Sequence, residues 1–77
     1  MTTIKAGDEV RVLDLTGGCD PKVATVAALQ GAYIIVRYER PTLGRRVDQF
    51  YAESGWRAWD GELRWRIESF VTKETTP

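Results

Sequence analysis

The chain has 77 residues, and eleven basic side chains balance eleven acidic ones, so its formal net charge is zero. This length predicts one domain, because most domains contain ~50 to 200 residues. A balanced charge excludes the long-range field that draws strongly basic proteins to nucleic acid or to an anionic membrane. We therefore expect a single domain over residues 1–77, with residues 1–5 and 71–77 frayed at its ends.

The first predicted elements, in chain order, are a strand and a loop. Residues 9–15, "EVRVLDL", follow Gly7-Asp8 and alternate valines with charged side chains, which predicts a half-buried strand. Residues 16–22, "TGGCDPK", contain two adjacent glycines and no periodicity, so they predict a flexible loop.

Residues 23–39, "VATVAALQGAYIIVRYE", predict two strands joined at Gln30-Gly31. A helix over 22–32 is the competing prediction, because alanine favours helices, but the valines, the threonine and the glycine favour a strand. In the second strand, alternation predicts two faces: Ala32, Ile34, Val36 and Tyr38 on one, and Tyr33, Ile35 and Arg37 on the other.

The next segment predicts an exposed, arginine-rich loop at 40–46, "RPTLGRR", and a strand at 47–53, "VDQFYAE". Ser54-Gly55 indicates a break or a bulge, and the polar residues 71–77 indicate a tail. With the closing hairpin described below, these elements predict an all-β fold: a small SH3-like barrel of five or six short antiparallel strands.

Residues 7–39, "GDEVRVLDLTGGCDPKVATVAALQGAYIIVRYE", resemble the KOW-type opening of SH3-like barrels. They share its Gly-Asp pair, its alternating valine strand, its glycine-containing loop and its second hairpin. Ala24 replaces the glycine expected in the second strand, and the loop is not rich in lysine, so the resemblance implies the fold more than the family's RNA contacts. The second half of the chain is similar to small barrels of unknown role carried by phages and mobile elements.

The strongest local signal is Asp60-Gly61, within "SGWRAWDGELRWRIESF" at 54–70, because Asp-Gly favours a two-residue type I′ turn. In that register Trp56 faces Trp65 across a hairpin. The predicted core face is Trp56, Ala58, Leu63, Trp65 and Ile67, and the predicted exposed face is Arg57, Trp59, Glu62, Arg64, Arg66 and Glu68. A short 3₁₀ turn over 55–59 is the competing geometry, and it would place Trp56 and Trp59 on one face.

The chain contains few groups suited to catalysis or metal binding. It has no histidine, so the usual general base and the commonest metal ligand are both missing. Cys19 is the single cysteine, which excludes an internal disulfide, and we expect an incidental free thiol. Asp8 and Glu9 fall on opposite faces of a predicted strand. We therefore predict that the protein is not an enzyme and has neither a cofactor nor a metal.

The start of the chain, "MTTIKAGDEV", lacks the charged region and apolar run of a signal peptide. The longest apolar stretch, "VATVAAL" at 23–29, is far too short to span a bilayer. With a single cysteine, these features predict a cytoplasmic protein that makes no contact with membranes.

Arginine is favoured over lysine for bidentate and stacking contacts, and with tryptophan it is enriched at interface hot spots. The predicted partner-binding residues are Arg40, Arg45, Arg46, Arg57, Trp59, Arg64 and Arg66. A protein partner, in a binding or regulatory role, is the first prediction; RNA or DNA, as in KOW-like domains, is the alternative, and a homo-oligomer is compatible with both. The competing interpretation is that the arginines are ordinary solvated side chains, since six acids lie among them in residues 37–68.

Overall fold

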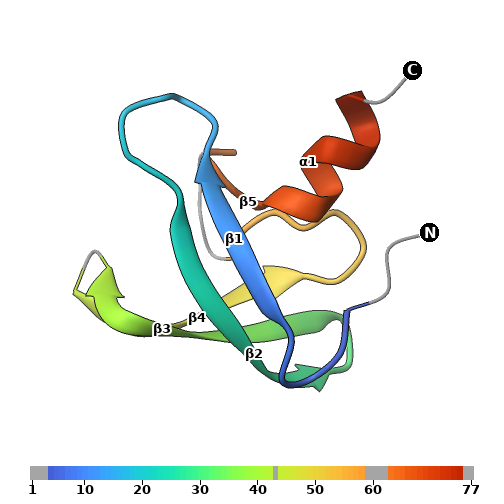
Figure 1. Cartoon of the computed structure of the whole chain (residues 1–77). Coiled ribbons are helices and arrows are strands. Elements are labelled where there is room, and N and C mark those ends of the chain that lie inside the picture. Colours follow the sequence, from blue (N-terminus) through green and yellow to red (C-terminus); the bar gives the residue numbers. More distant parts are fainter. Residues whose placement is uncertain (1–3, 43, 59–62, 76–77) are drawn as a thin grey trace.

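The computed structural model of the chain describes residues 4–42, 44–58 and 63–75 (Figure 1). Its elements in chain order are β1 (Glu9–Asp14), β2 (Lys22–Gln30), β3 (Tyr33–Thr42), β4 (Arg45–Tyr51), β5 (Trp65–Ile67) and α1 (Glu68–Thr75). The strands form one antiparallel sheet in the order β4-β3-β2-β1-β5, curled into a half-barrel. The predicted all-β, barrel-like fold is confirmed.

The segment with two competing predictions, β2, forms a strand. Ala24 and Val26 are buried while the intervening and flanking side chains are more exposed, a period of two that a helix cannot produce. The pairing with β3 shifts between Val26 and Ala28, as at a β-bulge, which bends the strand. Gly31 has a φ of 57° in the two-residue link to β3, a conformation that glycine adopts without strain.

The buried face of the sheet carries one hydrophobic core, composed of Val12, Ala24, Val26, Ile34, Val36, Tyr38, Phe50, Trp65 and Ile67. In β3 the alternating residues Ile34, Val36 and Tyr38 are buried as predicted, whereas Ala32 is exposed in the preceding turn. A short chain buries a smaller fraction of its surface than a large domain does, so each large side chain in this core contributes substantially to stability.

The chain after β4 forms a strap, residues 55–58, that bridges the two edges of the sheet. Backbone hydrogen bonds of 2.7 to 3.0 Å hold it on both sides. On the β4 side Ala58 N–H donates to Gln49 O, Gly55 N–H donates to Tyr51 O and Tyr51 N–H donates to Trp56 O, and on the β5 side Arg57 N–H donates to Trp65 O and Ile67 N–H donates to Gly55 O. The strap therefore pairs with both edge strands and closes the gap that the sheet alone leaves open.

The predicted register of the closing hairpin is wrong. Trp56 pairs with Arg66 instead of Trp65, a shift of one residue, and residues 55–58 form bridges to two strands in place of the competing 3₁₀ turn. Leu63 is 70% exposed, although it was predicted in the core, whereas Arg66 is buried. The reason is that β5 pairs with β1, so long-range pairing sets its faces. The turn at Asp60-Gly61 lies outside the described residues.

A helix, α1, follows β5 where the sequence predicts the end of a hairpin and a polar tail. Its Phe70 side chain packs against the core and rests on the strap at Gly55, where a Cβ atom would overlap the ring. Gly55 also has a φ of 76°. Glu68 in the first turn suits the positive end of the helix dipole. Among the described residues, no helix has the length and apolar character needed to cross a membrane.

Candidate partner-binding surface

The structure divides the predicted partner-binding arginines into two groups. The first group lies against the barrel and contacts the protein itself: Arg57, Arg64 and Arg66. The second group is exposed on the arm formed by the end of β3 and the start of β4, which projects from the rest of the barrel (Figure 1), although one of its members, Arg45, also pairs with Asp48: Arg40, Arg45 and Arg46. Trp59 lies outside the described residues.

Arg64 binds the buried carboxylate of Asp14. Its Nε donates to Oδ1 at 3.1 Å and its Nη2 donates to Oδ2 at 3.0 Å, while the backbone N–H and hydroxyl of Thr16 also donate to Oδ1. The Arg64 hydrogen bond, with help from Thr16, holds the pKa of Asp14 well below its usual range, although burial acts in the opposite direction. Arg64 therefore fixes the loop after β1, and its part in partner binding stays a prediction.

This ion pair predicts an acid-sensitive contribution to stability. A carboxylate whose pKa is lowered on folding stabilises the protein above its ordinary pKa of 3.8 and loses that contribution as the pH falls further. Asp14→Asn should therefore lower the urea midpoint at neutral pH, and the difference from wild type should shrink steadily below pH 3.8. Asp20→Asn, in the neighbouring exposed loop, is the control and should give only a small change in the urea midpoint. A gap for Asp14→Asn that is equal in neutral and acidic urea titrations would contradict this role.

A second buried carboxylate, that of Asp48, is 6% exposed and lies against two more arginines. Its Oδ2 accepts a hydrogen bond from the Tyr38 hydroxyl at 3.0 Å, and its oxygens lie 3.4 Å from Arg45 and 3.9 Å from Arg57. Burial raises the pKa of Tyr38, and the Asp48 charge adds to the rise, so the hydroxyl stays protonated and remains a donor. Arg45 and Arg57 thus compensate a buried charge of the barrel.

Arg66 is 7% exposed and joins the strap to β5 through its side chain. Its Nε donates to the Ser54 carbonyl at 2.7 Å, and its guanidinium lies 4.7 Å from the centroid of the Trp56 ring. A cation–π contact shielded from water contributes up to ~2 kcal/mol. The predicted exposed face of the hairpin is therefore wrong for Arg66, which is part of the packed structure.

Arg37 in the middle of β3 and Arg46 on the arm are exposed, and no described residue forms a hydrogen bond or ion pair with either guanidinium. Both line one hollow of about 670 Å³, with Tyr38, Glu39 and Val47 forming the rest of its wall. We call it the Arg37–Arg46 hollow. It brings two unpaired positive charges to one place on the surface.

The hollow forms where the ladder between β3 and β4 is interrupted. Arg37 pairs with Val47, and the next pair along the arm is Thr42 with Arg45, so residues 38–41 of β3 face only Arg46 of β4. An excess of residues on one strand bends and opens a strand pair. The sequence "RPTLGRR" at 40–46 predicts a loop here. In the structure β3 extends to Thr42 and β4 begins at Arg45, so both strands continue into the predicted loop.

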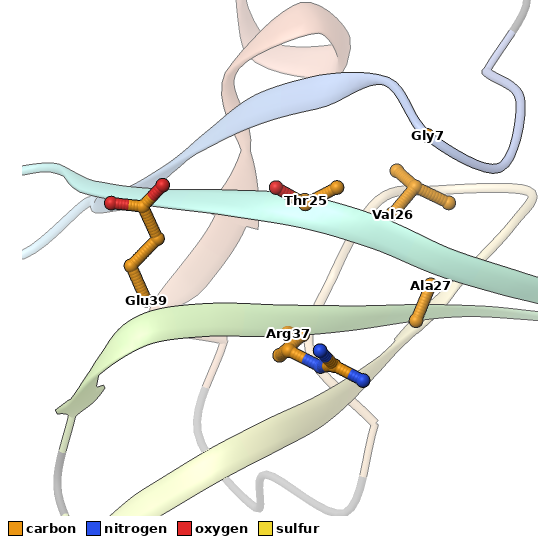
Figure 2. A pocket seen from close by; sticks show the side chains of 6 residues that line it. All are labelled: Gly7, Thr25, Val26, Ala27, Arg37 and Glu39. Atoms are coloured by element: carbon orange, nitrogen blue, oxygen red, sulfur yellow. The ribbon is translucent and has the colours of Figure 1, made fainter.

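A second hollow of about 490 Å³ lies on the other side of β3 (Figure 2). Its lining residues are Gly7, Thr25, Val26, Ala27, Arg37 and Glu39. Figure 2 shows the Glu39 side chain extending toward β2, whereas the Arg37 side chain points away from Glu39. Glu39 therefore forms no ion pair with Arg37, and the two residues line both hollows.

Arg37 is the functional candidate that the sequence prediction missed. The alternation of β3 places it on the outward face, but its importance depends on its cross-strand neighbours, Thr25 and Val47, neither of which is acidic. Arg46, predicted to lie in an exposed loop, is exposed, and its role in partner binding stays a prediction. Arg40 is exposed on the same arm, and Arg45 is paired with Asp48.

Chemically, the surface suits recognition of an anionic group. Two exposed guanidiniums in one hollow can each donate parallel hydrogen bonds to a carboxylate or a phosphate. Within the described ranges, no cluster of three or more carboxylate or thiol side chains could hold a metal ion, and Cys19 is an exposed thiol. No protein-family model, no curated protein and no solved structure matches the chain.

Proposed function

We propose that the chain is a non-enzymatic protein-binding module and that the Arg37–Arg46 hollow is the centre of its contact surface. The observation that carries this proposal is the contrast among the arginines. Arg37 and Arg46 are exposed and have no partner in the described chain, whereas Arg57, Arg64 and Arg66 are engaged with barrel groups. Arginine is enriched among the residues that dominate interface energies.

We also propose that the fold is an SH3-like barrel. The support is the single antiparallel sheet, which follows chain order apart from β5, together with the strap that pairs with β4 and β5. The resemblance of residues 7–39 to the opening of KOW-type barrels agrees with this assignment. Small barrels present recognition sites on their outer faces and loops, which is where the arm lies.

A protein partner fits this surface better than the RNA or DNA that a KOW-like domain would bind. Glu39 lines both hollows and would repel a phosphate backbone, and Val47, 50% exposed, adds an apolar contact that phosphates do not use. The zero net charge provides no general attraction to nucleic acid. Interleaved arginine and apolar side chains are typical of protein interfaces.

A pull-down from the native host lysate, with and without nuclease, tests the function. We expect a protein that is retained after nuclease treatment and whose affinity falls about thirtyfold for Arg37→Ala/Arg46→Ala, since hot-spot truncations cost ~2 kcal/mol or more. Arg11→Ala is the matched control: Arg11 is an exposed arginine that pairs with Glu68 at 2.9 Å, and its loss should leave binding unchanged. If the partner is no longer retained after nuclease treatment, nucleic-acid binding would replace the proposal. If neither Arg37→Ala/Arg46→Ala nor Arg11→Ala changes the affinity for the retained protein, the contact surface would lie elsewhere.

A further inference from the structure

We propose that the partner presents an acidic segment, with an Asp or Glu carboxylate bound between Arg37 and Arg46. This inference rests on the proposed function and specifies the chemistry of its partner. Both arginines line the same hollow, and the buried acid of β4, Asp48, is already held by Tyr38, Arg45 and Arg57. The hollow therefore holds two arginines against the single carboxylate of Glu39, and a carboxylate from outside would neutralise the remaining positive charge.

The charges around the hollow define the segment further. Glu39 also lines the hollow, carries a negative charge and has no described partner, so it would accept a hydrogen bond from the bound segment. Arg37 and Glu39 lie two positions apart on one face of β3, a separation of ~6.6 Å at 3.3 Å per residue. An extended segment that places a carboxylate over Arg37 thus places a donor, such as a backbone N–H, a hydroxyl or an amine, over Glu39.

The apolar wall favours a polypeptide over other polyanions. Val47 is half exposed beside Arg37, and Ala27 lines the hollow on the opposite side of β3. A side chain of the partner that covers Val47 would exclude water from the carboxylate–guanidinium contacts and strengthen them. Nucleic acid would meet Glu39 with a phosphate and leave Val47 uncovered.

Backbone amide NMR titrations test the inference with defined probes. Two probes are peptides of about ten residues: one alternates glutamate with valine and serine, and the other has glutamine in place of each glutamate. The other two probes are oligothymidylate and oligouridylate with the same charge as the acidic peptide. Because short segments bind weakly, each probe is titrated to about millimolar concentration. We expect the acidic peptide to shift the amide signals of residues around Arg37 and Arg46. The glutamine peptide should bind at least about tenfold more weakly than the acidic peptide, and the oligonucleotides should also bind more weakly than the acidic peptide.

Arg37→Ala/Arg46→Ala should abolish the shifts from the acidic peptide, and Arg11→Ala should leave them unchanged. Equal binding of the glutamate and glutamine peptides, no shift with either, or preferential binding of an oligonucleotide would overturn the inference. These failures are distinct from failure of the proposed function. If the pull-down retains a protein through Arg37 and Arg46 while the acidic peptide does not bind, the function stands and the acidic chemistry is wrong.

Discussion

Gly55→Val is expected to lower the free energy of unfolding by about 3 kcal/mol or more, because it adds two penalties at one position. The φ of 76° is a conformation that a β-branched residue resists, at roughly 1 to 2 kcal/mol, and the added side chain would overlap Phe70, which overpacks the contact by ~1 to 3 kcal/mol. The strap would then separate from α1 or from the edges it joins. Urea unfolding followed by tryptophan fluorescence measures the change.

Gly31→Val separates the two penalties. Gly31 also has a positive φ, of 57°, but a Cβ there meets no atom within 4 Å, so this variant carries the conformational cost alone. We expect it to be clearly less destabilised than Gly55→Val. Equal losses for the two variants would show that Phe70 does not rest on the strap as described.

Trp65→Ala should cost ~3 to 5 kcal/mol, the usual range for a large aromatic removed from a packed core. Trp65 is 3% exposed, lies on β5 and packs within the core cluster. In a domain whose total stability is ~5 to 15 kcal/mol, this loss removes a large share of the free energy of unfolding. The measurement is the urea midpoint, supported by the dispersion of amide NMR signals.

Leu63→Ala is the matched comparison, because the sequence pattern placed Leu63 and Trp65 on the same core face. The structure leaves Leu63 exposed, so its truncation should change stability by no more than about 0.5 kcal/mol. A large loss for Leu63→Ala together with a small one for Trp65→Ala would restore the hairpin register predicted from Asp60-Gly61.

Local patterns predicted much of the fold because the information they carry is local. The alternation of valines in β1, the tight turn at Gly31 and the two faces of β3 follow from the side-chain period of strands. The choice of strand over helix for β2 followed from residue type. Trp65 and Ile67 were predicted in the core, and both are buried.

Errors arose where distant segments determine the structure. The turn signal at Asp60-Gly61 fixes a register only if the two flanking strands pair mainly with each other, but β5 pairs with β1, and the strap pairs with both β4 and β5. Glu68 was predicted in a strand and begins a helix instead, and no hydrophobic pattern in the polar segment after it indicates one.

The role of each arginine also depended on distant partners. Arg64 is bound by Asp14, fifty positions earlier in the chain, so its neighbours in sequence gave no indication that it is engaged. For Arg37 the sequence gave no indication that the side chain lacks a partner, because it lies in an ordinary strand pattern. Its unpaired charge beside a hollow is apparent only from its cross-strand neighbours and from the interrupted β3–β4 ladder.

We propose that Arg64 and Arg66 hold the barrel while Arg37 and Arg46 remain available to a partner. Exchange of the arginine Nε–H protons with water, measured by NMR on the free protein, distinguishes the two groups. We expect slow exchange for Arg64 and Arg66, whose Nε–H groups donate to Asp14 and to the Ser54 carbonyl, and fast exchange for Arg37 and Arg46. Fast exchange at Arg64 and Arg66, or protection at Arg37 and Arg46, would contradict it.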